Sequence, residues 1–331
     1  MATPQLVTIF GGAGFVGTQL VQAFARKNYR VRVAVRRPDL AGHTKIHGAV
    51  GQVMPVQANL RNAASVARAV QGADIVVNLV GIGDPSGKQT FDAVHVEGAR
   101  TVARAAREAG ASALVHMSAL GIDKVPASAY ARSKLAGEQA VLETFPGAVV
   151  LRPSIIFGPG DGFFNLMGSL AQISPVLPLI GGDSRVQPVW VGDVADAFVL
   201  AAEGVVKAGR VYELGGPDVV TYKELLTRIL AETGRKRLLL PLPAPIANLL
   251  ALPLGLIPGP KLLTADKVAL LGADNVVSPE AIREKRTLAA FGITPTSMAT
   301  IVPTYLWRFR KNGQFDRFGD DTHSASTGTT V

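Results

Sequence analysis

The feature that most constrains this chain is an apolar stretch, Leu6–Phe10, that runs directly into the glycine-rich sequence GGAGFVG at positions 11–17. An amphipathic stretch follows at once. Strand, tight glycine turn and helix in this order predict the first unit of a dinucleotide-binding fold. Gly12, Gly14 and Gly17 fit its pattern, because one glycine permits the turn, one lets the backbone approach a pyrophosphate, and one lets helix pack on strand. The helix then offers free amides and its positive dipole end to the phosphates.

The first 160 residues continue this alternation of short β-branched runs and alanine-rich helical patterns. Such alternation predicts a parallel sheet with helices on both faces, and the nearly all-apolar strands agree with two covered faces. The expected strands are Leu6–Phe10, Val31–Val35, Gly51–Val56, Ile75–Leu79, Ala113–Met117 and Ala148–Leu151. The expected helices are Phe15–Lys27, Ala63–Val70, Val94–Ala109 and Ala129–Phe145. We therefore expect an α/β fold built on a Rossmann doubly wound parallel sheet.

Beyond Pro153 the rhythm breaks, and glycine, proline and phenylalanine become frequent. Three later elements are still predicted, namely a helix at Asp193–Glu203, a strand at Arg210–Leu214 and a helix at Tyr222–Thr233. We expect residues 1–160 to form the NAD(P)-binding domain, and residues 161–311 to finish the sheet and add a small discontinuous lobe. Residues 312–331 end in Ser, Thr and Gly and are expected to be a disordered tail.

The composition excludes several kinds of site. The chain of 331 residues has no cysteine, so disulfides, thiolate metal sites and a cysteine nucleophile are excluded. Of the 5 histidines, His43 and His47 could pair on a metal, but no third ligand lies nearby, so no metal site is predicted. The net charge of +9 either serves solubility or attracts something acidic, such as a cofactor phosphate, an anionic lipid or an acidic partner. Because the basic residues are scattered rather than interleaved with aromatics, no nucleic-acid partner is predicted.

The run Leu238–Pro260 contains no charged residue and is long enough to raise the question of a membrane span. Its repeated prolines, among them Pro241, Pro243 and Pro245, argue against a continuous spanning helix, and Ile246–Leu252 could make a couple of turns at most. The run is either buried in the lobe or an apolar patch that faces a membrane or a partner. We expect no transmembrane helix and no signal peptide, because the first apolar run is already a strand.

The end of the second predicted strand favours NADP(H) over NAD(H). An NAD enzyme usually carries an acid there, which binds the ribose hydroxyls. This chain has Arg36 and Arg37 instead, and their guanidinium groups suit the 2′-phosphate of NADP(H). An ordinary solvated basic loop is the alternative interpretation.

A candidate hydride-transfer site follows the fifth predicted strand. Ser118 comes directly after that strand, and Tyr130 and Lys134 lie at the start of the next helix. Their spacing of four places both on one helical face. An ammonium beside a phenol lowers the phenol pKa, so Tyr130 could pass a proton while Lys134 holds the nicotinamide ribose. Ser118 could polarise a substrate carbonyl.

Together these motifs resemble the extended or atypical short-chain dehydrogenase/reductase superfamily. The resemblance rests on GGAGFVG, Asn59-Leu60, NLVG at Asn78–Gly81, Ser118, YARSK at Tyr130–Lys134, LRPSIIFGPGD at Leu151–Asp161 and QPVWVGDVADA at Gln187–Ala197. It implies Ser118, Tyr130 and Lys134 as catalytic residues. It also implies a cofactor site made of Gly11, Gly12, Ala13, Gly14, Phe15, Val16, Gly17, Arg36, Arg37, Asn59, Leu60, Val80, Gly81, Tyr130, Lys134, Pro153, Ser154 and Ile155.

A narrower resemblance is carried by HVEGARTVARAAREAG at positions 95–110, HMSALGID at 116–123, the proline-rich run and LLTADKVALLGADNVVS at Leu262–Ser278. These segments are similar to the NADPH-binding accessory subunit of respiratory complex I and its bacterial relatives, over roughly residues 5–305. The resemblance implies a subunit on the peripheral arm near the membrane, which binds NADPH for stability and assembly rather than for turnover.

Three departures from active relatives agree with that implication. Asn59 stands where most extended relatives place an aspartate that contacts the adenine. Ser118 is followed by Ala119 rather than by the usual second serine nearby, and a shift of one residue can turn a hydroxyl away from the site. His95 replaces the asparagine that usually supports a water near the catalytic lysine.

Three functions follow from the sequence. The one it favours is an NADP(H)-binding accessory subunit of complex I, the NADH:quinone oxidoreductase, with a structural cofactor and protein partners in a membrane respiratory complex. Its place would be the cytoplasmic face of a bacterial inner membrane, or the matrix side in a mitochondrion, with Leu238–Pro260 available to the membrane surface. The second is an active NADP(H)-dependent reductase, epimerase or dehydratase on a sugar nucleotide or another carbonyl substrate. The third is an NADP(H)-sensing regulatory protein.

Overall fold

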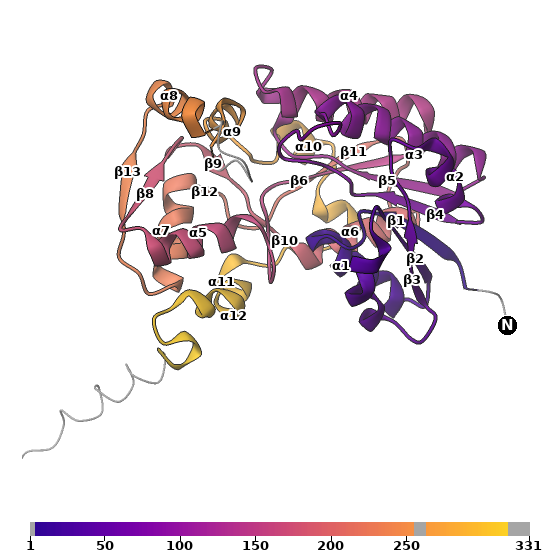
Figure 1. The fold of residues 1–331 in the computed structure, drawn as a ribbon, viewed down its shortest axis with the longest axis horizontal. Coiled ribbons are helices and arrows are strands. Elements are labelled where there is room, and N and C mark those ends of the chain that lie inside the picture. The colour runs from indigo at the N-terminus through magenta and orange to yellow at the C-terminus, as the bar shows by residue number, and fades with distance from the viewer. Residues whose placement is uncertain (1–3, 255–262, 317–331) are drawn as a thin grey trace, which may run out of the picture.

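The central sheet is the predicted one. The computed structural model describes residues 4–254 and 263–316, and within these ranges seven strands form one sheet in the order β11-β6-β5-β4-β1-β2-β3 (Figure 1). Every pairing in it is parallel. Because β1 pairs with both β2 and β4, the strand order reverses at β1, and a crevice opens there beyond the strand ends. The strands are β1 (Leu6–Phe10), β2 (Arg30–Val35), β3 (Val53–Gln57), β4 (Ile75–Asn78), β5 (Ala113–Met117), β6 (Val149–Pro153) and β11 (Val211–Leu214).

Helices cover both faces of this sheet. On β1, Val7 and Ile9 pack with one set of helices, while Leu6 and Phe10 pack with the other, as the period of two along a strand requires. The first face carries α1 (Phe15–Arg26) and α6 (Val191–Ala202). The second carries α2 (Ala63–Val70), α3 (Glu97–Glu108) and α4 (Ala129–Thr144).

A smaller lobe lies beside the sheet, on the left in Figure 1. Its core gathers Phe157, Phe164, Tyr222, Leu225 and Leu306. It contains α5 (Phe163–Ile173), α7 (Tyr222–Glu232), α8 (Ala244–Leu254), α9 (Ala265–Leu271), α11 (Met298–Ile301) and α12 (Pro303–Leu306), and α10 (Pro279–Arg283) leads back to the sheet. Its paired strands are β7 (Ile156–Phe157) with β10 (Val189–Trp190), β9 (Arg185–Val186) with β12 (Val220–Thr221), and β8 (Val176–Leu179) with β13 (Leu238–Pro241).

Several short helical turns join these elements. The described residues contain 3-10 turns at Pro38–His47, Ile122–Lys124, Leu288–Phe291, Trp307–Phe309 and Gly313–Asp316, and a π-helical turn at Asp92–Val96. The last 3-10 turn falls within the segment that we expected to be disordered, and residues 317–331 lie outside the described ranges.

The charge-free run divides into a strand and a helix. Leu238–Pro241 forms β13, Ala244–Leu254 forms α8, and residues 255–260 lie outside the described ranges. The helix is longer than the two turns we expected, because Pro245 lies in its first turn, where a missing N–H costs nothing. Among the described residues, no helix has the length and apolar character needed to cross a bilayer.

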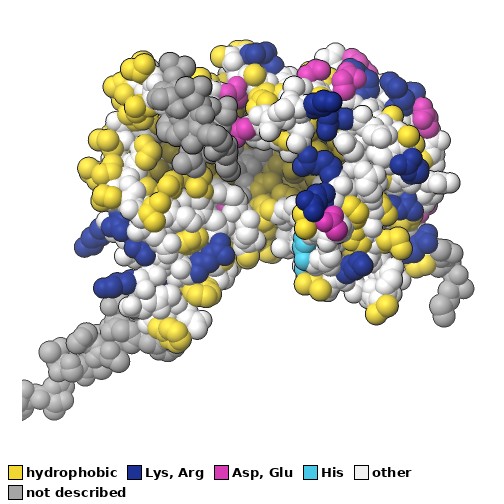
Figure 2. Space-filling model, in the orientation of Figure 1, with side chains coloured by type: hydrophobic (Ala, Val, Ile, Leu, Met, Phe, Trp, Pro, Cys, Tyr) yellow, Lys and Arg dark blue, Asp and Glu magenta, His cyan; other side chains and the backbone are white. Residues whose placement is uncertain are grey.

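In α8 the small side chains are buried and the large apolar ones are exposed, which is the reverse of a typical amphipathic helix. The small residues Ala247 and Ala251 are buried, whereas the large apolar side chains of Ile246, Leu249 and Leu250 are exposed. Figure 2 shows apolar side chains gathered over α8 and β13 at one edge of the lobe. The described part of the run therefore exposes large apolar side chains rather than burying them in the lobe.

A glycine in α4 gives a test of the packing. Gly137 crosses the π-helical turn so closely that a Cβ there would overlap the carbonyl oxygen of His95. Helix propensity alone would favour alanine by about 1 kcal/mol. We expect Gly137→Ala instead to lower the free energy of unfolding by about 3 kcal/mol, because backbone atoms must separate. Urea unfolding measures this, with Ala136→Gly on the exposed side of α4 as control. A Gly137→Ala variant more stable than the parent would contradict the close approach.

Candidate functional site

The glycine turn leaves the N-terminus of α1 bare at the crevice. Gly14 is its N-cap and supplies no side-chain hydrogen bond, so the first amides keep their donors. Gly11 adopts a φ of +81°, a conformation that favours glycine. A Cβ on Gly17 would overlap the Gly11 carbonyl oxygen, so only glycine lets the helix approach the turn this closely. The positive end of the helix dipole therefore faces the crevice.

A groove of about 620 Å³ runs along the ends of β1, β2, β3 and β4. It brings together eight of the predicted cofactor contacts, namely Gly11, Ala13, Gly14, Arg36, Arg37, Leu60, Val80 and Gly81. The rest of its lining is apolar and consists of Ala34, Val35, Leu40, Ala58 and Leu79. Bare amides at one place, cations at another and apolar walls between them fit the phosphates and the rings of a dinucleotide.

The two arginines stand at the open side of this groove. Arg36 donates to the Gln89 side chain at 2.6 Å, and Arg37 pairs with Asp39 at 2.9 Å. Both guanidinium groups are exposed, and each has five N–H donors, so donors remain for a ligand. Figure 2 shows a hollow between the two halves of the molecule, with basic side chains along the sheet side of its rim.

Four predicted cofactor residues lie beneath or beside the groove. Gly12, Val16 and Gly17 are buried under the turn and shape it. The Asn59 side chain accepts a hydrogen bond from the Arg61 amide at 3.1 Å, and Asn59 is not among the residues that line the groove. Asn59 therefore orders the loop after β3 in this structure.

The remaining predicted contacts lie nearer the lobe. Phe15 packs against Gly158, in the loop that follows β7. Pro153 ends β6, and the Ser154 hydroxyl donates to the Asn275 side chain. Ile155 lines a second cavity beyond the ends of β5 and β6.

Lys134 is buried beneath the loop that follows β4. Its Nζ donates to the Met117 carbonyl at 2.7 Å, and a Cβ on Gly81 would lie 4.0 Å from that nitrogen. Burial lowers the pKa of Lys134 to about 8, although Glu138 opposes the shift. The amine thus lies at the end of the groove that Gly81 lines.

The phenol of Tyr130 differs from the prediction. Burial, and next the charge of Asp266, raise the pKa of Tyr130 to about 12. The expectation that the neighbouring lysine lowers this pKa is therefore wrong for this structure, because desolvation and a carboxylate on a distant segment outweigh it. Tyr130 lines the second cavity, so it is placed to touch a ligand there.

Ser118 takes a different position from Tyr130. It is buried, and its hydroxyl has no hydrogen-bond partner among the described residues. Its neighbour Ala119 lines the second cavity, and Ser118 does not. Of the three predicted catalytic side chains, only Tyr130 reaches that cavity.

His95 has a role that the sequence did not predict. Its Nε2 accepts from the Ile82 amide at 3.0 Å, and its Nδ1 lies 2.8 Å from the Ser133 hydroxyl. Ser133 donates to the Tyr130 carbonyl, so its oxygen must accept from His95, which assigns the proton to Nδ1. Burial, and next the charge of Lys134, lower the pKa of His95 to about 4. A neutral His95 therefore ties the loop after β4 to α4.

The segment from Thr264 to Ser278 closes over the strand ends. Asp266 accepts from the Ser128 hydroxyl at 3.0 Å and from the Ala129 amide at 2.6 Å, and so caps α4. Lys267 pairs with Asp84 at 2.8 Å, across from the groove loop. The Asn275 side chain donates to the Leu120 carbonyl at 2.7 Å. This segment lies within Leu262–Ser278, one of the segments that carry the resemblance to the complex I subunits.

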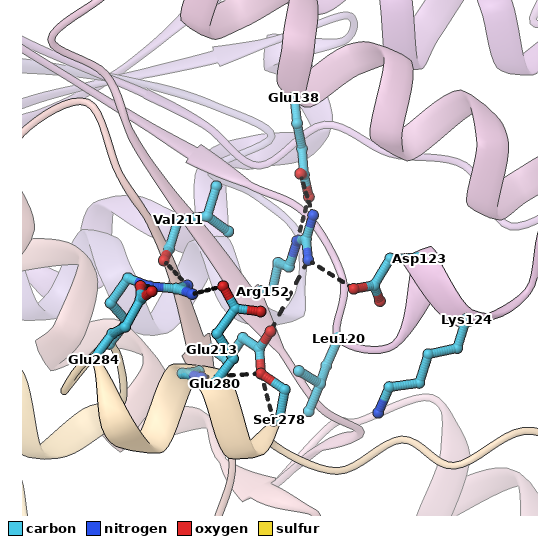
Figure 3. Close-up of polar contacts among 12 residues, drawn as sticks. Leu120, Asp123, Lys124, Glu138, Arg152, Val211, Glu213, Ser278, Glu280 and Glu284 are labelled. Atoms are coloured by element: carbon cyan, nitrogen blue, oxygen red, sulfur yellow. Dashed lines mark hydrogen bonds and ion pairs between the residues drawn. The ribbon is translucent and has the colours of Figure 1, made fainter.

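An ion-pair cluster anchors the far end of that segment, as Figure 3 shows. Arg152 on β6 makes two hydrogen bonds to Glu138 on α4, at 2.8 and 2.7 Å. It also lies 3.5 Å from Asp123 and 4.0 Å from Glu213. Glu213 on β11 accepts from the Ser278 amide at 2.7 Å. The cluster thus joins the sheet, α4 and the C-terminal segment at one point.

Residues 7–215 match the profile of the NAD dependent epimerase/dehydratase family. The chain belongs to this family. A solved structure with the same fold is dTDP-glucose 4,6-dehydratase DesIV of Streptomyces venezuelae, which was crystallised with NAD and TYD. The two structures superpose with a TM-score of 0.70 at 21% sequence identity, over 95% of this chain and 98% of that one. The expected fold is thereby confirmed.

Curated relatives extend the match beyond the sheet. The chain is 31% identical to NADH dehydrogenase (ubiquinone) 1 alpha subcomplex subunit 9 of Arabidopsis thaliana mitochondria, over 93% of this chain and 79% of that protein. It is 29% identical to the NADH-ubiquinone oxidoreductase 40 kDa subunit of Neurospora crassa, over 93% of this chain and 80% of that one. A ceramide reductase of Caulobacter vibrioides is 34% identical over 72% of this chain and 74% of its own length. The resemblance to the complex I subunits is thereby confirmed.

Within residues 4–254 and 263–316, no cluster of three or more His, Asp or Glu side chains could hold a metal ion. His43, one of the two histidines considered from the sequence, contacts the Leu40 carbonyl at 3.2 Å.

Because the pKa of the buried His95 is lowered, we expect the free energy of unfolding to depend on pH. Its pKa is near 4 in the folded chain, below the ordinary value of 6.5, so the stabilisation by neutral His95 is complete above pH 6.5 and is lost as the pH falls toward 4. Between pH 6.5 and pH 4, the titration of His95 lowers the free energy of unfolding by about 3 kcal/mol. We expect His95→Asn, which keeps a donor and an acceptor but does not titrate, to reduce the acid loss of unfolding free energy by that amount. Parallel pH curves for the parent and the variant in urea unfolding would contradict the assignment.

Proposed function

We propose that this chain is an NADP(H)-binding accessory subunit of a respiratory complex I, in which the cofactor is held and not turned over. The observation that carries the proposal is the incomplete catalytic set, because the buried Ser118 hydroxyl has no hydrogen-bond partner among the described residues, while Ala119 lines the cavity. The phenol of Tyr130 has a pKa of about 12, far from the neutral range in which a general acid works best. The curated relatives named as complex I subunits support the same function.

The cofactor in this proposal is NADP(H). Gly11, Ala13 and Gly14 would hold the pyrophosphate, Arg36 and Arg37 the 2′-phosphate, and Lys134 the nicotinamide ribose beside Gly81. When bound, the nicotinamide supplies a hydride donor or acceptor. The bare turn, the exposed guanidinium groups and the apolar walls are what support this choice.

The two arginines give the test of the nucleotide. We expect the double variant Arg36→Ala, Arg37→Ala to bind NADPH about 10- to 100-fold more weakly, because two charge-assisted contacts are lost. The affinity for NADH should stay unchanged. Calorimetric titration of both nucleotides measures this, with Arg68→Ala on the exposed side of α2 as a matched charge control. Equal losses for NADPH and NADH would count against a 2′-phosphate contact.

The apolar face of α8 is the docking surface in this proposal. Ile246, Leu249 and Leu250 would contact the membrane arm or its lipid, with the chain on the cytoplasmic face of a bacterial inner membrane or on the matrix side in a mitochondrion. Large exposed apolar patches mark such surfaces, and the buried alanines of α8 already satisfy its packing.

Replacing these leucines tests the docking surface. We expect the double variant Leu249→Asp, Leu250→Asp to fold as the parent does, because both side chains are exposed, and to be recovered with complex I from solubilised membranes about tenfold less. Ile46→Asp is the control. Ile46 is also a large exposed apolar residue, but it lies in the 3-10 turn after β2 and not in α8. Full recovery of the double variant would exclude α8 from the interface, and unfolding would show that it is packed.

A second function is favoured by one observation. Tyr130 lines a cavity at the end of the cofactor groove, as an active reductase requires, and one relative is named a ceramide reductase. If the protein is an active reductase, it should consume NADPH in the presence of a carbonyl substrate, and the variant Tyr130→Phe should not. The accessory-subunit proposal expects no consumption by either protein.

A further inference from the structure

The second cavity has a mainly apolar lining. It measures about 190 Å³ and lies between the ends of β5 and β6, α7 and the C-terminal segment. Its walls include Ile122, Val125, Ile155, Val186, Leu270 and Leu271. Among the described residues that line it, none carries a positive charge.

The one carboxylate in the lining is already paired. Arg185 holds Asp274 through its Nε at 3.0 Å and its Nη2 at 2.7 Å, and its backbone amide donates at 2.8 Å. A phosphate or carboxylate placed here would lose its hydration beside Asp274 and find no cation in the wall. Burying an unpaired charge is too costly for such a site, so the lining selects against anionic ligands.

Two tyrosines line this cavity, one from the sheet domain and one from the lobe. Tyr130 comes from α4, and Tyr222 is the first residue of α7. Tyr222 is 5% exposed, and neither hydroxyl makes a hydrogen bond within the part of the chain that the structure describes. Burial raises the pKa of Tyr222 to about 12, so this phenol, like that of Tyr130, stays protonated at neutral pH. Both hydroxyls are therefore hydrogen-bond donors for an oxygen of a ligand in the cavity.

We propose that this cavity binds an uncharged, mainly apolar ligand with a carbonyl or hydroxyl oxygen, and that Tyr222 orients that oxygen. The apolar walls supply the affinity, and the two phenols supply hydroxyl donors that make no hydrogen bond to the described residues. This goes beyond the proposed function, which requires only the dinucleotide groove. The lining of this cavity shares no residue with the lining of the groove that holds the dinucleotide in the proposed function.

The test uses the full chain, with and without saturating NADPH, and three probes in calorimetric titrations. We expect 2-decanone to bind saturably, decanoate to bind at least about tenfold more weakly, and UDP-glucose not to bind. Preference for decanoate or for UDP-glucose would overturn the proposal, and so would a lack of saturable 2-decanone binding. NADPH affinity is recorded in the same samples. If NADPH alone fails to bind, the proposed function fails while the cavity result stands.

Variants separate orientation from bulk packing. Tyr222→Phe should weaken 2-decanone about tenfold and leave NADPH affinity unchanged, because one hydrogen bond is lost. Tyr212→Phe is the matched control, since that buried phenol donates to the Lys207 carbonyl away from the cavity. Unchanged 2-decanone affinity in Tyr222→Phe would overturn the role of Tyr222. Leu270→Lys places a cation in the wall and should reverse the preference toward decanoate, and an unreversed preference would overturn the electrostatic argument.

Discussion

The contact between the backbones of Gly11 and Gly17 is the constraint from which the site follows. Because neither residue has a side chain, α1 lies directly on the turn after β1, and its free amides reach the crevice. The same placement sets Phe15 against Gly158, so the loop that enters the lobe is positioned by the turn as well. α1 then packs on α6, which returns from the lobe to the sheet. One close approach thus fixes both the groove and the lobe that stands beside it.

The second half of the site is held by polar contacts between distant segments. Asp266 caps α4 from 138 positions away, and Lys267 reaches Asp84 across 183 positions. The Arg152 cluster fixes the far end of the same segment to β6 and β11 (Figure 3). These contacts hold Leu270 and Leu271 in place as a wall. The cavity therefore exists only in the folded whole, whereas the groove is largely made by the first ninety residues.

This division explains what the sequence could predict. The strands β1–β6 and helices α1–α4 follow local apolar periodicity and turn chemistry, and the glycine turn with Arg36 and Arg37 lies within forty residues, so the groove was predictable. The raised pKa of Tyr130 depends on Asp266, and the exposure of Leu249 depends on how alanines of α8 pack, neither of which a local pattern contains. The sequence predicted a plain helix from Val94, whereas the structure has a π-helical turn at Asp92–Val96, where α4 packs closely against it at Gly137. Long-range contacts account for each of these differences.

The chemistry of the buried phenols links the two proposals. A phenol with a pKa of about 12 is a weak proton donor to a developing alkoxide, so Tyr130 is poorly suited to turnover at neutral pH. The same property makes it a dependable hydrogen-bond donor, because the proton stays on the oxygen over the whole physiological range. Lys134, with a pKa of about 8, is held by the Met117 carbonyl and adds a charge next to Gly81 rather than next to a reacting oxygen. In the two proposals, such a site would hold a dinucleotide and a neutral apolar ligand side by side, with electrostatics that favour holding both over transferring a hydride between them.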